Sequence, residues 1–148
     1  MIDDAFVVSD GPILIKYVGK QDRVIVPSNV IGMSPEAFKD NSYVKEVVLP
    51  NRIYSIKDYA FSNCSFLSKI DLPSELETIG RRAFSNCPCL KSITIPKNVV
   101  DIHSEAFDAT PIKTITFQNV KAKWKITRSI SLKGVVVHCL DGDLVIDY

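Results

Sequence analysis

Few of the residue patterns that mark catalytic, membrane-spanning or metal-binding proteins occur in this sequence. No run of about 18 apolar residues is present, so no membrane insertion is expected. A glycine-rich phosphate loop is also missing. The two histidines, His103 and His138, lie far apart and outside any nucleophile, general-base or zinc signature. We therefore expect no enzyme activity, no cofactor and no bound metal.

Neither sign of charge dominates the chain. Eighteen Lys and Arg residues stand against 17 Asp and Glu residues, which leaves a formal net charge of +1. A protein that binds nucleic acid mainly through its phosphates needs a strong positive field, and this composition supplies none. Nucleic acid is therefore not expected as the main partner.

Cysteine is too scarce for a disulfide framework, and no secretory signal opens the chain. The four cysteines, Cys64, Cys87, Cys89 and Cys139, are irregularly spaced for a protein of 148 residues. Residues 1–4 lack the basic and then apolar segments of a signal peptide. The compartment stays open at this point, because a signal trimmed before Met1 would leave the same sequence.

A repeat of 23 residues organises most of the sequence. The dipeptide Ala-Phe recurs at this interval, at 37–38, 60–61, 83–84 and 106–107. A second column at the same interval closes an apolar triplet with proline, at Pro27, Pro50, Pro73 and Pro96. Two independent columns that share one period identify a repeat architecture.

Apolar residues fill further columns in the same register. They lie three and six residues past each proline, at Val30, Ile53, Leu76 and Val99 and at Met33, Ile56, Ile79 and Ile102. Each copy ends in a short alternating segment such as 67–72, and the fourth copy is one residue short, in the turn 108–111. A unit with such scattered apolar positions cannot bury its own core. We therefore predict a stack of coils whose alternating segments pair as a parallel sheet, each strand ended by a proline.

The phenylalanine column is expected to carry most of the core. Phe38, Phe61, Phe84 and Phe107 would form an internal ladder of stacked rings. The alanine before each ring would allow close approach of the backbone between coils.

Both ends depart from the repeat, as the uncovered ends of a stack must. We predict one domain, 1–148, with an N-terminal cap at 1–20, four to five repeats over 21–117 and a C-terminal cap at 118–148. The N-terminal cap is expected to hold two short strands around an Asp-Gly-Pro turn, within 6–17.

The C-terminal cap combines the densest positive charge with a predicted last strand. The basic stretch 121–128 suits either a cap helix or a contact with nucleic acid or membrane, and we favour the helix because the whole chain is close to neutral. Trp124, the only tryptophan, is expected to shield the last coil. A strand within 134–139 and a turn at Asp141-Gly142 complete the cap.

The columns, written Leu-x-x-Ile-x-Leu-Pro-x-x-Leu-x-x-Ile-x-x-x-Ala-Phe-x-x-Cys, resemble the BspA-type leucine-rich repeat family of bacterial proteins. Residues 67–87 carry the resemblance best, through Ile70, Leu72, Pro73, Leu76, Ile79, Ala83, Phe84 and Cys87. The resemblance implies a leucine-rich-repeat solenoid of the α/β class, β-dominated, that is, a right-handed curved stack with a parallel sheet on its concave side. It also implies binding rather than catalysis, since members are often cell-surface or secreted proteins and some are linked to adhesion.

The outward positions of the predicted concave sheet are the expected partner-binding surface. This face is short, polar and mildly basic. Its candidate residues are Lys45, Glu46, Lys69, Asp71, Lys91, Thr94, Lys113 and Thr116. The lysines suit an acidic protein partner, although lysines that only keep the sheet soluble fit the sequence equally well. No aromatic residue occurs at these positions, so stacking of sugars or bases is not supported.

Two groups of residues leave a structural and a functional interpretation open. Cys64 and Cys87 share one repeat position and would form buried thiols or, between adjacent coils, a disulfide or metal site; we favour buried thiols. The Cys87-Pro88-Cys89 sequence is a weak redox or metal signal. His138 with Asp141 and Asp143 would suit a cation, but a solvated turn is the preferred interpretation.

The leading functional hypothesis is a non-enzymatic protein-binding module. The alternative is an exported segment that serves adhesion or structure at a bacterial cell surface. An enzyme built around His138 and Asp141 is a third, less favoured hypothesis. Exposed strand edges at the ends of the stack would also allow two molecules to pair.

Overall fold

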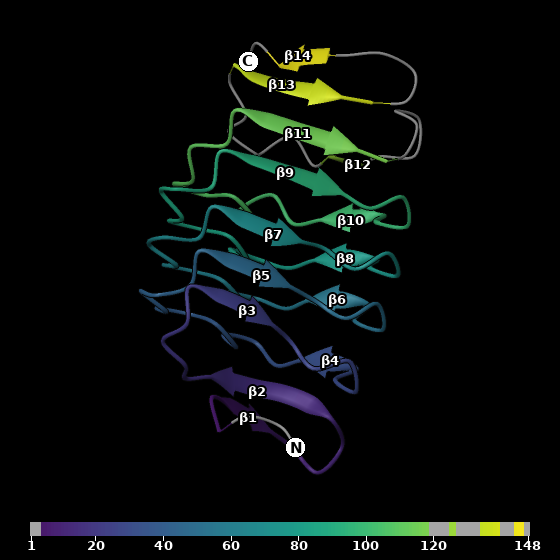
Figure 1. The fold of residues 1–148 in the computed structure, drawn as a ribbon. Helices are drawn as coiled ribbons and strands as arrows, with labels where there is room; N and C mark the ends of the chain where they lie inside the picture. The colour runs from purple at the N-terminus through teal and green to yellow at the C-terminus, as the bar shows by residue number, and fades with distance from the viewer. Residues whose placement is uncertain (1–3, 119–124, 127–133, 140–143, 147–148) are drawn as a thin grey trace.

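The structure is a computed structural model that describes residues 4–118, 125–126, 134–139 and 144–146. Within these ranges every regular element is a β-strand, and the chain winds through successive coils (Figure 1). The strands are β1 (Phe6–Val8), β2 (Ile13–Tyr17), β3 (Arg23–Ile25), β4 (Gly32–Met33), β5 (Glu46–Val48), β6 (Ser55–Ile56), β7 (Lys69–Asp71), β8 (Thr78–Ile79), β9 (Ser92–Ile95), β10 (Asp101–Ile102), β11 (Thr114–Phe117), β12 (Lys125–Ile126), β13 (Val135–His138) and β14 (Leu144–Ile146).

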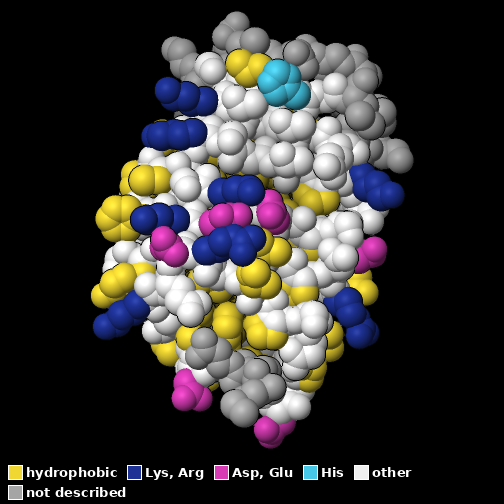
Figure 2. Space-filling model, viewed as in Figure 1, with side chains coloured by type: hydrophobic (Ala, Val, Ile, Leu, Met, Phe, Trp, Pro, Cys, Tyr) yellow, Lys and Arg dark blue, Asp and Glu magenta, His cyan; other side chains and the backbone are white. Residues whose placement is uncertain are grey.

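Equivalent strands of successive coils lie side by side on two sides of the stack. The front sheet contains β3, β5 and β7 and then β9, β11, β13 and β14, and it faces the viewer in Figures 1 and 2. The back sheet contains β1, β2 and β4 and then β6, β8, β10 and β12. Neighbouring coils pair in parallel one repeat apart, as Val24, Val47 and Ile70 do across β3, β5 and β7. The predicted solenoid of 23-residue coils with a parallel sheet is confirmed.

Each sheet is interrupted once along its length. The hydrogen-bonded ladder of the front sheet stops between β7 and β9, and that of the back sheet stops between β4 and β6. The two interruptions fall at different coil junctions, so every junction among these coils keeps at least one bonded sheet.

The third side of each coil is a series of tight turns that contain the Ala-Phe dipeptides. These turns bond from coil to coil through the backbone: the N–H of Phe38 donates to the Ala60 carbonyl at 2.7 Å and that of Phe61 to the Ala83 carbonyl at 2.8 Å. The turns require left-handed φ at several non-glycine positions, which are Glu36, Asp40, Tyr59, Asn63, Arg82, Asn86 and Ala109. Hydrogen bonding thus continues around the coil where no strand is present.

A side-chain ladder runs along these turns. The amide of Asn63 donates to the Asp40 carboxylate at 2.8 Å, and the amide of Asn86 donates to the Asn63 side-chain oxygen at 2.9 Å. All three residues have positive φ, a backbone conformation that Asn and Asp adopt more readily than other side chains. The same residue types therefore satisfy the turn and link successive coils.

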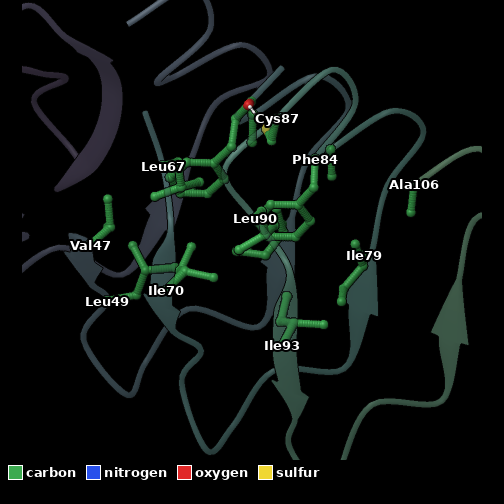
Figure 3. Close-up of a cluster of buried hydrophobic side chains, with 14 of the residues drawn as sticks. Val47, Leu49, Leu67, Ile70, Ile79, Phe84, Cys87, Leu90, Ile93 and Ala106 are labelled. Atoms are coloured by element: carbon green, nitrogen blue, oxygen red, sulfur yellow. Dashed lines mark hydrogen bonds between the residues drawn. The ribbon is translucent and has the colours of Figure 1, made fainter. Parts of the chain in front are cut away.

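The four phenylalanines form the predicted ladder in the interior. Ring centroids lie 4.9 Å apart for Phe38 and Phe61, 5.3 Å for Phe61 and Phe84, and 5.6 Å for Phe84 and Phe107. All four rings are buried. Figure 3 shows the surroundings of Phe84, where aliphatic side chains from neighbouring coils point into the same interior.

The ladder continues into the N-terminal cap, which the repeat did not predict. Tyr17 stacks on Phe38 at 5.0 Å, and Phe6 contacts Tyr17 at 5.0 Å. The two short strands predicted around the Asp-Gly-Pro turn are present as β1 and β2, which form an antiparallel pair. The parallel pairing of β2 with β4 was not part of that prediction. Gly19 lies against the Tyr17 ring, where a side chain would clash. The cap therefore covers the first coil with aromatic rings and an added strand.

The C-terminal end differs from the prediction in two respects. The strand expected within 134–139 is present as β13, which pairs in parallel with β11, but it is not the last strand, because β14 follows it and pairs with it in antiparallel. The cap helix expected over 121–128 is wrong at Lys125–Ile126, because these residues form β12 and extend the back sheet beside β10. The repeat thus continues past Phe117 on this side. Trp124 and the turn at Asp141-Gly142 lie outside the described residues.

Candidate partner-binding face

Outward side chains of the front sheet form two columns that run from coil to coil. The first column contains Arg23, Glu46, Lys69, Ser92, Thr114 and Val136, and the second contains Ile25, Val48, Asp71, Thr94, Thr116 and His138. In β7, for example, Ile70 is buried between exposed Lys69 and Asp71. Charged side chains cross the middle of this face, and mostly white atoms, which belong to uncharged polar side chains and the backbone, lie above them (Figure 2). The face is therefore charged and apolar toward the N-terminal coils and rich in hydroxyls toward the C-terminal ones.

The eight residues predicted for the concave face all lie on this side of the molecule. Five project from front strands: Glu46, Lys69, Asp71, Thr94 and Thr116. The other three, Lys45, Lys91 and Lys113, are exposed and immediately precede β5, β9 and β11. The predicted residues thus share one surface, with the lysines along the edge where the strands begin. Their role in binding stays a prediction.

Ion pairs neutralise the N-terminal half of this face. The carboxylate of Glu46 forms ion pairs with Arg23 Nε at 3.4 Å and with Lys69 Nζ at 3.3 Å. The Nζ of Lys45 lies 3.9 Å from the carboxylate of Asp22. Exposed pairs of this kind contribute about 0–1 kcal/mol to stability, so their main effect is on the surface field. That field is accordingly weaker here than the lysine count suggests.

The C-terminal half of the edge keeps its positive charge. Lys91 donates to the Pro88 carbonyl at 2.8 Å, a contact that leaves its charge uncompensated. Within the described part of the chain, no acidic side chain pairs with Lys91 or Lys113. Among the described residues, Lys91 and Lys113 therefore keep unpaired positive charge on this side.

A shallow hollow of about 510 Å³ lies on the front sheet where its ladder is interrupted. At the other front junctions the carbonyls of Asp22, Lys45 and Lys91 each accept N–H groups of the next coil. Between residues 68 and 92, which are all described, the Ser68 carbonyl makes no such bond. Long side chains of β7 and short hydroxyl side chains of β9 and β11 then form unequal walls. The lining consists of Ser68, Lys69, Ile70, Asp71, Leu72, Ser92, Ile93, Thr94, Pro96, Thr116 and Gln118.

Sequence reasoning missed the contribution of the first coil to this face. Arg23 and Ile25 project from β3 in register with Glu46 and Val48. Extending the 23-residue interval back from β5 would have found both. Ile25 matters chemically, because it is an exposed aliphatic side chain on a face expected to be polar.

The two repeat cysteines are buried free thiols, as favoured. The Sγ of Cys64 donates to the Phe38 carbonyl at 3.2 Å, and that of Cys87 donates to the Phe61 carbonyl at 3.1 Å. Burial raises the pKa of the Cys64 thiol, and it raises the pKa of Cys87 to about 11. Both thiols therefore stay protonated at neutral pH and link adjacent coils, while Cys89 is exposed.

The histidines do not assemble a reactive group within the described ranges. His103 accepts the Glu105 N–H at its Nδ1, at 3.2 Å, which is a turn contact. In those ranges no cluster of three or more His, Cys, Asp or Glu side chains is arranged to hold a metal ion. Asp141 and Asp143, which were considered with His138, lie outside the described residues.

In the described part of the chain, no helix has the length and apolar character needed to span a bilayer.

Comparison with known proteins identifies the repeat. The family model described as BspA type leucine rich repeat region matches residues 16–127 in six copies. No curated protein matches the sequence.

Similar solved structures are bacterial leucine-rich repeat proteins. A leucine-rich repeat protein of T. pallidum has a TM-score of 0.68 at 21% identity, over 94% of this chain and 81% of that one. A leucine-rich cell surface protein of Faecalibacterium prausnitzii has a TM-score of 0.70 at 23% identity, over 86% of this chain and 35% of that one. The pneumococcal vaccine antigen PcpA has a TM-score of 0.69 at 20% identity, over 93% of this chain and 41% of the antigen. At these identities the likeness shows the fold alone.

Proposed function

Because the chain belongs to the BspA-type leucine-rich repeat family, we propose that it is a non-enzymatic module that binds a protein partner through its front face. The observation that carries the proposal is the register of that face, where outward side chains repeat in line from β3 to β7 and from β9 to β13. The buried ladder of rings beneath holds the coils in place. A surface ordered before contact loses little conformational entropy on binding.

The chemistry of the face favours a polar and partly acidic partner surface. Lys91 and Lys113 supply charge that no acidic side chain of the described ranges pairs with, and Thr94 and Thr116 supply hydroxyls that donate or accept hydrogen bonds. Complementary charge raises the rate of encounter and excludes basic partners more than it adds affinity. We therefore expect binding to weaken as salt concentration rises.

Charge reversal tests this proposal. The triple variant Lys45→Glu, Lys91→Glu, Lys113→Glu should lose a partner that crosslinks to the purified chain in native lysate, because the potential of the edge is inverted. Its melting temperature should stay close to that of the parent, since exposed substitutions change stability by about 0.5 kcal/mol or less. Lys57→Glu is the matched control, because Lys57 is exposed just beyond the back strand β6.

Two results would contradict the proposal. A partner that binds the triple variant with unaltered affinity would place the contact elsewhere on the molecule. A chain that captures no partner but turns over a substrate would be an enzyme.

A second candidate, an exported segment acting in adhesion or structure at the cell surface, is supported by the similar structures of a cell surface protein and a vaccine antigen. Surface biotinylation of intact cells that make the protein tests it, and labelling that appears only after lysis counts against it.

Pairing of two molecules through strands at the ends of the stack is also proposed. Sedimentation velocity that shows a monomer at micromolar concentration would contradict this pairing.

A further inference from the structure

Two aromatic side chains are exposed in adjacent coils at the edge where the front strands begin. Tyr43 lies three residues before β5 and Phe66 three residues before β7, with exposed fractions of 46% and 51%. Apolar and basic side chains follow one another along this margin, at the left of Figure 2. The same repeat position holds Lys20 and Cys89 in the flanking coils, and both are exposed. Because lysine and cysteine fit this position as well, the packing of the coil gives no reason for the two rings.

Lysines border the two rings. The Nζ of Lys20 lies 5.6 Å from the centre of the Tyr43 ring. Lys45 and Lys91 come two residues after Tyr43 and Cys89, and Lys113 occupies the equivalent place in the next coil. We call these seven residues the edge ridge: Lys20, Tyr43, Lys45, Phe66, Cys89, Lys91 and Lys113. Among the described residues, Asp22 is the one acidic residue that forms an ion pair with a lysine of the edge ridge, at 3.9 Å from Lys45.

We propose that the edge ridge docks an acidic segment of a protein partner, and that apolar side chains of this segment cover Tyr43 and Phe66. The proposal rests on the protein-binding function proposed above and moves its energetic centre from the middle of the front face to its edge. Charge complementarity identifies the occupant, because among the described residues the four lysines of the ridge form an ion pair with a single aspartate, Asp22. Large aromatic side chains are also overrepresented among the residues that dominate protein interfaces.

The dimensions suit a short extended segment that crosses the coils. Adjacent coils are spaced by about 4.8 Å, so the coils of Lys45 and Lys113 lie roughly 15 Å apart. An extended chain advances about 3.3 Å per residue, so about five residues span that distance. Nucleic acid fits less well, because the net charge of the whole chain is +1.

Three synthetic peptides of about twelve residues test the proposal. The first is rich in Asp and Glu and carries two Leu and one Phe; the second has Ser in place of these apolar residues; the third has Lys in place of the acidic ones. Only the first should bind in fluorescence anisotropy, and its affinity should fall as salt rises. In NMR spectra of the full chain, the largest amide shift changes should occur at Tyr43, Phe66 and Lys91.

Matched variants separate the ridge from other exposed rings. The double variant Tyr43→Ser, Phe66→Ser should bind the first peptide about tenfold more weakly or worse. Tyr54→Ser should bind it normally, because Tyr54 is also 51% exposed but precedes the back strand β6. Should the double variant aggregate, Lys45→Glu with Lys91→Glu provides the same comparison without touching the rings.

Each outcome has a distinct meaning. Shift changes confined to Lys69, Thr94 and Thr116 would overturn the ridge proposal and leave binding through the front face intact. Equal loss of affinity in Tyr54→Ser, or equal binding of a thymidine oligonucleotide of similar length, would overturn it as well. If no peptide binds while lysate crosslinking still captures a partner, only the ridge proposal fails. Failure of both assays removes the protein-binding function too.

Discussion

Replacing Phe61 with alanine perturbs the centre of the stacked interior. The ring is fully buried, and the rings of Phe38 and Phe84 lie on either side at 4.9 and 5.3 Å. Truncating a buried Phe costs about 3–5 kcal/mol. Each lost ring pair adds about 0.5–1.5 kcal/mol beyond burial, so we expect a loss in the upper half of that range. In a domain of this size such a loss lowers the melting temperature by roughly 10–20 °C.

Urea unfolding followed by far-ultraviolet circular dichroism measures this loss as a change in the free energy of unfolding. Phe66→Ala is the control, because Phe66 is five residues away but 51% exposed, and it should change stability by about 0.5 kcal/mol or less. A double-mutant cycle with Phe84 should give a coupling energy of about 0.5–1.5 kcal/mol. If Phe61→Ala and Phe66→Ala cost the same, or if Phe61→Ala costs less than about 1 kcal/mol, the interior ladder does not stabilise the fold as argued.

Two further predictions concern close packing and thiol chemistry. Gly80→Ala should destabilise the fold by about 1–3 kcal/mol in the same urea assay, because the added Cβ would lie 2.9 Å from the backbone nitrogen of Asp58, whereas Gly11→Ala, with nothing within 4 Å, should be neutral. Equal effects would show that the coils yield at Gly80. At pH 8 a thiol reagent should label Cys89 in the native protein but reach Cys64 and Cys87 only after unfolding. The pKa of Cys87 is raised from 9.0 to about 11, so the unfolded chain loses this proton first, and stability is full below pH 9 and falls as pH rises toward 11. Cys87→Ala should make that decline shallower, and an unchanged decline would refute the assignment.

The interior was predictable because burial places the same kind of side chain at the same point of every coil. The column of Phe38, Phe61 and Phe84 therefore reveals both the repeat period and the ring ladder. In β7, the apolar Ile70 between two charged residues identifies the side chain that points into the interior. Tyr17 joins the ladder 21 residues before Phe38, outside the period, so column counting missed it. The cap is an antiparallel strand pair and not a repeat coil, so the ring of Tyr17 enters the core from a strand and not from an Ala-Phe turn.

The candidate site was predictable to the level of a face and no further. Alternation assigned Lys69 and Asp71 to the outward side, as the structure has them. Tyr43 and Phe66 are exposed because of the path that the turn before each strand takes. Residue type alone does not tell whether an apolar side chain in a turn points into the core or into solvent. The interruption between β7 and β9 leaves no mark in the residue columns, which continue unchanged across it.

That interruption leaves the front side of the stack without a continuous backbone ladder, so fewer backbone hydrogen bonds resist bending there than on the back. At the same junction β8 remains bonded to β10, and the N–H of Phe84 donates to the Ala106 carbonyl at 2.8 Å. Bending that tilts the charged plate of β3, β5 and β7 against the hydroxyl-rich plate of β9, β11 and β13 therefore breaks no ladder on the front. A ligand that contacts both groups of strands would favour one angle between them, so its binding would change the curvature of the stack.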